Sequence, residues 1–197
     1  MQKRNVIKNV CLIVILSIAV AVGLNCLLLF ADIAQYSERY QEATVVLYSP
    51  PFIQQILYSG ILIPILEELL FRGLMFRLLR RWIAFPWAMV FSAVVFGAYH
   101  GNIVQFIYAT ICGVLLAYLC EKYDSIIAPV LSHMMMNLVS IILTQAGVFA
   151  WVMDSGVKVL FIVAFCVATG VFALYMLQKM DVTKVLKIYC KDMGNDI

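Results

Sequence analysis

Long apolar stretches interrupted by few charged residues constrain this 197-residue chain more than any other feature. Hydrophobic residues make up 64% of the sequence and charged residues 13%, whereas soluble domains are near half apolar and about a quarter charged. The candidate membrane-spanning stretches are Val10–Phe30, Phe52–Leu70, Phe85–Tyr99, Ile103–Cys120, Ile126–Leu143 and Val159–Leu177. Most approach the ~20 residues that a helix needs to cross a bilayer. Because open strand edges are unsatisfied in lipid, the sequence predicts an all-α polytopic transmembrane helical bundle of about six spans.

The placement of basic residues predicts the orientation of this bundle. If the N-terminus is inside, only Arg39 and Lys158 of the 14 Lys and Arg residues lie outside. The positive-inside rule then predicts a multi-pass cell-membrane protein with both termini in the cytoplasm. The mixed basic and apolar run from Leu74 to Trp82 is expected to form an amphipathic helix in the inner interface.

The expected organisation of the chain follows from these spans. Residues 1–51 would form an N-terminal transmembrane helix and an external loop, residues 52–143 the core that carries the unusual polar residues, and residues 144–197 a C-terminal transmembrane helix with a basic cytoplasmic tail. The lipid bilayer is therefore an expected partner, and nothing in the composition indicates a nucleic-acid partner or a particular oligomeric state. The six cysteines show no CxxC spacing, which argues against a disulfide framework.

Two adjacent glutamates and an arginine, Glu67, Glu68 and Arg72, stand near the end of the second apolar stretch. A charged group at mid-membrane costs ~2.5–3.5 kcal/mol on insertion scales. On a helix, Glu68 and Arg72 are four residues apart and can pair, whereas Glu67 points about 100° away. The spacing therefore predicts a structural ion pair between Glu68 and Arg72, and it leaves Glu67 free to face a cavity.

The only two histidines of the chain lie on two further apolar stretches. His100 follows the third stretch, four residues after Phe96, and the fifth stretch carries His133 and Asn137 one helical turn apart on the same face. Ionisable residues within spans face the interior of a bundle or a water-filled cavity, where they are functional by default. Together with the glutamates, these residues predict one buried polar site.

Two chemistries are compatible with such a site. A glutamate near a histidine can take a proton from water, and a histidine with an asparagine can stabilise the oxyanion that forms when water attacks an amide carbonyl. Equally, Glu67, His100 and His133 are the ligand set of a catalytic zinc with an open fourth position. The residues alone leave both alternatives open.

The depth of the site is the hardest part to predict. Glu67 and His133 lie near the inner ends of their stretches, which favours a water-filled cavity open to the cytoplasm. His100, at the end of a full third span, would lie ~20 Å from the inner face at 1.5 Å per residue. Convergence therefore requires a short or strongly tilted third helix, or a third and fourth helix pair that dips into the membrane and returns with its turn at Gly101.

Three motifs in this core resemble those of the CPBP family, which comprises CAAX proteases, also called Abi or type II CAAX prenyl endopeptidases, and bacteriocin-processing proteins. The motifs are EExxxR at Glu67, Glu68 and Arg72, FxxxH at Phe96 and His100, and HxxxN at His133 and Asn137. Each motif is weak alone, but their order and spacing on hydrophobic helices match the family pattern from about Phe52 to Leu143.

This resemblance implies an intramembrane endopeptidase that acts on peptides or proteins near the membrane. It assigns water activation to Glu67 and His100, oxyanion stabilisation to His133 and Asn137, and supporting roles to Glu68, Arg72 and Phe96. A glutamate mechanism without a required cofactor is expected, with zinc as the possible exception. The alternative function is that of a non-enzymatic bacteriocin self-immunity protein. A small transporter is least favoured, because the polar residues converge on one site instead of following a path.

Overall fold

The computed structural model describes residues 2–180, apart from the side chains of residues 2–5, 33 and 34. Every regular element within residues 2–180 is a helix. Four of these helices are long and apolar enough to cross a membrane: α1 (Gln2–Phe30), α7 (Ile103–Tyr123), α8 (Ile127–Gln145) and α10 (Gly156–Lys179). The predicted all-α polytopic bundle is therefore confirmed. The predicted basic tail lies outside the described residues.

A continuous helical segment from Phe52 to Leu79 takes the place of the predicted second span. It consists of α3 (Phe52–Gln54), the π-helical η2 (Gln55–Leu62), α4 (Ile63–Glu68), the π-helical η3 (Leu69–Phe76) and α5 (Arg77–Leu79). The segment does not stop at Leu70, because the charge of Arg72 is neutralised inside the bundle and need not reach the interface. The run from Leu74 to Leu79 thus continues this helix, and the prediction of a separate interfacial helix was wrong.

The remaining elements are short. Helix α6 (Phe85–Tyr99) has only 15 residues. The 3-10 helix η1 (Ile33–Tyr36) and helix α2 (Glu38–Tyr48) follow α1, and α9 (Val148–Met153) precedes α10. The region of α2 was predicted to be an external loop.

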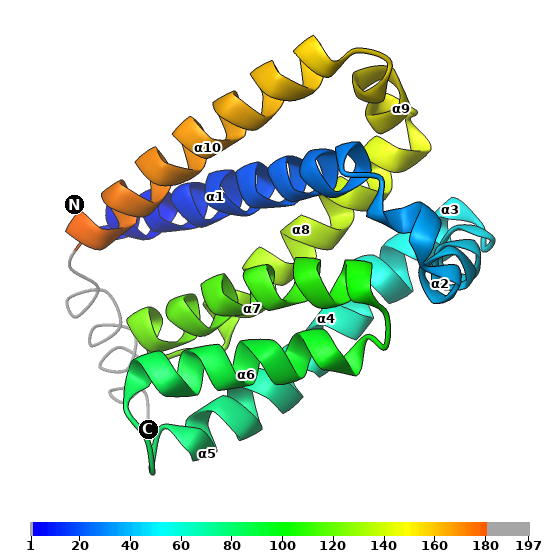
Figure 1. Ribbon diagram of the computed structural model, residues 1–197. Helices are drawn as coiled ribbons and strands as arrows, with labels where there is room; N and C mark the ends of the chain where they lie inside the picture. The colour runs from blue at the N-terminus through cyan, green and yellow to red at the C-terminus, as the bar shows by residue number, and fades with distance from the viewer. Residues whose placement is uncertain (1, 181–197) are drawn as a thin grey trace.

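Neighbouring long helices run antiparallel, so the start of α1 and the end of α10 share one end of the bundle, here called the N-terminal end (Figure 1). Helices α2, α3 and α9 lie at the opposite end, here called the α2 end (Figure 1). Apolar side chains such as Leu16, Leu119 and Leu177 bind α1, α7 and α10 together, and each is at most 3% exposed. This packing fixes the positions of α1, α7 and α10 relative to one another.

Small residues allow α6 and α7 to approach closely. A Cβ atom on Gly97 would collide with the Thr110 hydroxyl and would lie 2.7 Å from the backbone oxygen of Phe106. Backbone atoms cannot move aside as a flexible side chain can. Close backbone approach at small residues is a general means of packing helices in membranes.

We expect Gly97→Ala to lower the free energy of unfolding by about 1–3 kcal/mol, the usual effect of overpacking a tight contact. Thermal unfolding of the purified protein in detergent measures this change. Gly73→Ala is the matched control, because a Cβ there meets its nearest atoms at an ordinary 3.8 Å. Equal melting temperatures for the two variants would contradict the close packing of α6 and α7.

Candidate active site

A fully buried ion pair lies beside the site. Arg72 Nη1 donates to Glu68 Oε1 at 2.8 Å, and both side chains are 0% exposed. Arg72 Nη2 donates to the Gly113 carbonyl at 3.1 Å, and its guanidinium carbon lies 4.5 Å from the centroid of the Phe96 ring. The predicted pairing of Glu68 with Arg72 is confirmed. Phe96 and Gly113 add a cation–π contact and a hydrogen bond that offset the desolvation of the arginine.

His133 lies between the two glutamates. Its Nδ1 is 2.9 Å from Glu68 Oε1, and its Nε2 is 3.7 Å from Glu67 Oε2. Because Glu68 Oε1 also accepts from Arg72, Nδ1 is the donor, and Nε2 is directed toward Glu67. A carboxylate on one ring nitrogen fixes the tautomer and the orientation of an imidazole. This contact could not be predicted from the sequence, because no local spacing signals a bond between residues 65 positions apart.

His100 caps the C-terminal end of α6. Its Nδ1 lies 2.9 Å from the Phe96 carbonyl oxygen, which can only accept, so Nδ1 carries the proton and neutral His100 has a free lone pair on Nε2. Helix α6 ends here because Gly101 adopts a left-handed conformation with φ of 73°, and Asn102 begins α7 by accepting from the Gln105 amide at 2.8 Å. The tight turn therefore fixes His100 at one level in the bundle.

Asn137 completes the polar set from α8, one turn beyond His133. Its Nδ2 donates to the Ser59 carbonyl of η2 at 2.9 Å. An asparagine amide carries two N–H hydrogens, so this bond anchors the side chain and leaves a second hydrogen available. The contact also joins α8 to the helical segment that carries the glutamates.

Most of the predicted site residues line one cavity of about 290 Å³. Its wall includes Glu67, Phe96, His100, His133 and Asn137. Glu68 and Arg72 do not line it and lie behind the wall. The short third helix that convergence required is present as α6, so His100 reaches the level of Glu67, which lies near the middle of the segment from Phe52 to Leu79.

The remainder of the wall comes partly from α2, which sequence analysis did not identify as a helix. Its cavity-lining residues are Tyr40, Ala43, Thr44, Leu47 and Tyr48. The first four follow the i, i+3, i+4, i+7 spacing of one helical face, and the preceding Ser37 accepts from the Tyr40 amide as an N-cap. These local signals could have predicted α2. The cavity thus lies toward the α2 end, whereas sequence analysis placed it near the end with the N-terminus.

A zinc-dependent mechanism is the alternative that the sequence left open for this site. In the part of the chain that the structure describes, no three His, Cys, Asp or Glu side chains are placed together as a metal-binding group. Glu67, His100 and His133 do not form such a group as they stand. Zinc binding remains a prediction from the sequence.

The fold and the cavity define a polytopic helical membrane protein with a buried carboxylate–histidine site. A family model described as type II CAAX prenyl endopeptidase Rce1-like matches residues 49–139, the stretch that contains all three motifs. The chain is also 33% identical over 105 residues to "Putative membrane peptidase YdiL" of Bacillus subtilis (strain 168). That match covers 53% of this chain and 42% of the relative, so the chain spans less than half of the relative's length. No solved structure gives a significant match. The family match and this similarity support the resemblance to the CPBP family that the three motifs indicate.

Proposed function

We propose that this protein is a CAAX-protease-like intramembrane endopeptidase that hydrolyses peptide bonds of membrane-associated peptides or proteins. The observation that carries this proposal is the convergence of Glu67, His100, His133 and Asn137 on one cavity. The match to the endopeptidase family and the similarity to a protein named as a membrane peptidase support the same class of reaction.

Glu67 and His100 are proposed to activate the attacking water. Glu67 is the carboxylate on the cavity wall, its side chain is 13% exposed, and it interacts electrostatically with both histidines. The carboxylate takes one proton as the water oxygen bonds to the carbonyl carbon of the scissile amide. His100 can accept a hydrogen bond at Nε2 and helps to orient the water. When the carbon–nitrogen bond breaks, the proton returns to the leaving amine, so the products are a carboxylic acid and an amine.

His133 and Asn137 are proposed to stabilise the oxyanion of the tetrahedral intermediate. In its protonated form, His133 donates from Nε2, because Nδ1 is already engaged by Glu68. Asn137 contributes the amide hydrogen that Ser59 does not use. Donors that are held in place before the reaction need no reorganisation as the negative charge develops. Glu68, Arg72 and Phe96 are positioning residues that hold His133 through the buried ion pair.

We expect Asn137→Ala to lower kcat by about 10²–10³-fold, the usual loss for one oxyanion donor, with little change in KM. Cleavage kinetics of the purified protein on membrane-associated peptides measure both constants. Asn25→Ala is the matched control, because Asn25 also lines the cavity but bonds to the Ala21 carbonyl and the Ser140 hydroxyl. An equal loss in both variants would contradict the role of Asn137.

Metal analysis of the same preparations separates the two chemistries that the sequence left open. Activity in protein without bound metal supports the glutamate mechanism, whereas activity that tracks zinc content supports the metal alternative. Self-immunity that survives the combined loss of Glu67, His100 and His133 would favour the non-enzymatic alternative instead.

A further inference from the structure

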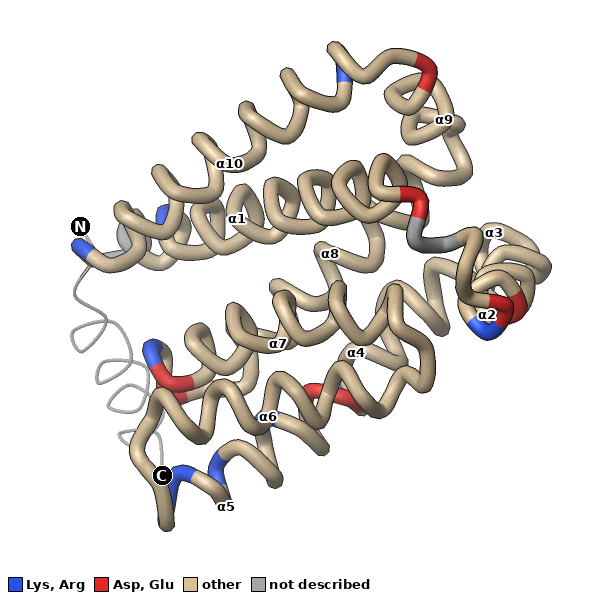
Figure 2. Tube along the Cα trace, viewed as in Figure 1, with Lys and Arg blue, Asp and Glu red and all other residues tan. Residues whose placement is uncertain are grey.

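The two ends of the bundle differ in charge (Figure 2). The described basic residues at the N-terminal end are Lys8, Arg77, Arg80, Arg81, Lys122 and Lys179, and those at the α2 end are Arg39 and Lys158. The acidic residues are Glu121 and Asp124 at the N-terminal end, and Asp32, Glu38, Glu42 and Asp154 at the α2 end. Basic residues flanking spans are enriched on the cytoplasmic side. This asymmetry favours a cytoplasmic N-terminal end and an external α2 end.

The cavity is confined to the half of the bundle near the α2 end. Among the described residues, its wall draws nothing from 69–95 or 113–132, the stretches that lead to the N-terminal end. That half is filled instead by the Glu68–Arg72 pair and by apolar side chains such as Phe76 and Leu116, which are 2% and 0% exposed. A packed layer therefore separates the candidate active site from the basic end.

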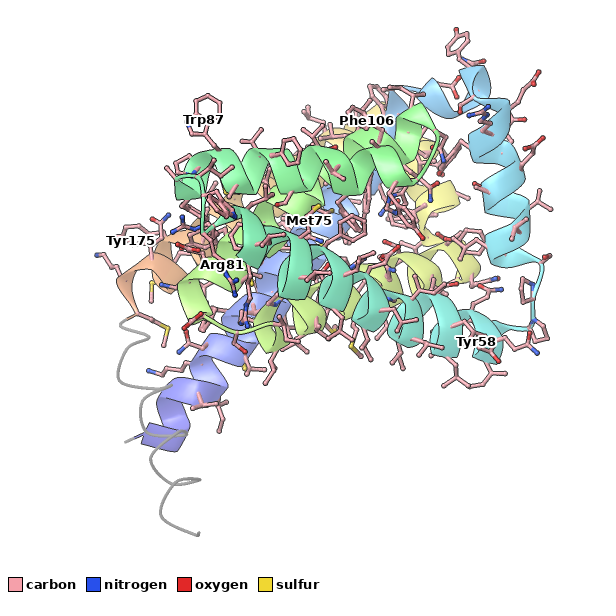
Figure 3. All side chains as sticks on the ribbon, turned by 90° about the horizontal axis from the view of Figure 1, so that it is seen from below. Tyr58, Met75, Arg81, Trp87, Phe106 and Tyr175 are labelled. Atoms are coloured by element: carbon pink, nitrogen blue, oxygen red, sulfur yellow. The ribbon has the colours of Figure 1, made fainter. Side chains whose placement is uncertain are left out.

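Helix α2 forms part of the wall of this cavity at the α2 end. Figure 3 shows α2 crossing the end of the bundle, with Tyr58 at the α2 end and Arg81 and Tyr175 at the N-terminal end. One face of α2 lines the cavity, while Val45 and Val46 on another are 67% and 72% exposed. Exposed apolar residues on a helix across the bundle axis suit the membrane–water interface.

Few polar contacts hold α2 over the cavity. Arg39 Nη1 lies 3.5 Å from the Gly101 carbonyl oxygen near one end of α2, and the Tyr48 hydroxyl lies 3.2 Å from the Thr144 hydroxyl at the other. The chain after α2 is held more firmly, because the buried Gln55 donates to the Tyr48 and Pro50 carbonyls at 3.2 and 2.8 Å. Helix α2 is thus tied at its C-terminal end both to α8 and, through the following chain, to the buried Gln55.

We propose that the cavity receives its substrates from the external side of the membrane, past α2, so that they are peptide segments exposed at the outer membrane surface. This inference rests on the proposed peptidase function, because only that function makes the occupant of the cavity a peptide substrate. The side of access rests only on charge, cavity position and packing. It replaces the cytoplasmic opening expected from the sequence, which assumed that the helix with Glu67 ends near Leu70.

Cysteine accessibility in intact cells tests the side of access. Thr44→Cys places a thiol on the cavity face of α2, and Arg81→Cys places one at the N-terminal end; the parent chain with its native cysteines is the blank. A membrane-impermeant maleimide is expected to label Thr44→Cys equally in intact and permeabilised cells, and Arg81→Cys only after permeabilisation. Labelling of Thr44→Cys only after permeabilisation would overturn the proposal.

The same labelling in a Glu67→Gln background keeps this test separate from catalysis. External labelling of Thr44→Cys there supports the side of access even if no peptide is ever cleaved. Glu42→Cys, on the exposed surface of α2, serves as a second reporter should Thr44→Cys disturb the packing of the cavity. Protection of both reporters in intact cells would contradict an external opening.

Discussion

Arg72→Met is expected to lower the free energy of unfolding by about 3–5 kcal/mol, the usual penalty for removing one partner of a buried ion pair. The substitution leaves the Glu68 carboxylate without its closest positive charge in a position that is 0% exposed. It also removes the donor to the Gly113 carbonyl between two packed helices. Unfolding in detergent or bicelles, followed by circular dichroism, measures the change.

Arg80→Met is the matched control for this prediction. Arg80 also forms an ion pair, at 2.8 Å with Glu121, but both side chains are about one-third exposed. Solvent screens a pair of that kind, so its removal should leave stability nearly unchanged. If Arg72→Met proves as stable as Arg80→Met, the buried pair does not hold the bundle together.

The double variant Glu68→Leu with Arg72→Met separates two roles of the buried ion pair: its effect on folding stability and its positioning of His133. Replacing both charges by apolar side chains removes the uncompensated carboxylate, and such replacements are often neutral or stabilising. We expect stability to recover while cleavage does not, because His133 Nδ1 loses its partner at Glu68 Oε1. Recovery of cleavage along with stability would show that Glu68 is only structural.

Glu67→Gln is expected to lower kcat/KM by about 10²–10⁴-fold, the range over which a positioned general base contributes. Glutamine keeps the shape of the side chain but cannot take a proton from water. Because Glu67 lines the cavity and is partly exposed, its neutralisation should leave the fold intact. Peptide cleavage kinetics, joined to a melting curve for each variant, measure both effects.

Glu121→Gln is the control that separates this effect from a general loss of charge. It removes a carboxylate of the same type from the Arg80 pair at the N-terminal end, away from the cavity. Its kinetics should match those of the unaltered protein. A comparable loss of activity in Glu121→Gln would mean that the effect of Glu67→Gln is not specific to the site.

Those parts of the site that depend on local spacing could be predicted from the sequence. The pairing of Glu68 with Arg72 follows from a separation of four residues, and the common face of His133 and Asn137 follows from the same spacing. The all-α class follows from hydropathy alone. The two pairings each involve residues of one helix, so no contact between helices is needed to predict them.

The depth and the direction of the site could not be predicted, because they depend on contacts between helices. The burial of Arg72 depends on the Gly113 carbonyl and the Phe96 ring, which belong to other helices. Once that charge is buried, the helix continues to Leu79 and Glu67 moves from the end of a span to its middle. For this reason the cavity lies toward the α2 end, and not near the end with the N-terminus as the sequence predicted.

Intact-mass spectrometry of a membrane-associated peptide incubated with the purified protein in liposomes tests the peptidase function of this cavity. We expect two fragments whose summed mass exceeds that of the peptide by one water, formed by the unaltered protein and by Glu121→Gln but not by Glu67→Gln. Equal fragment yields from the unaltered protein and Glu67→Gln would contradict the claim that this cavity is a peptidase active site.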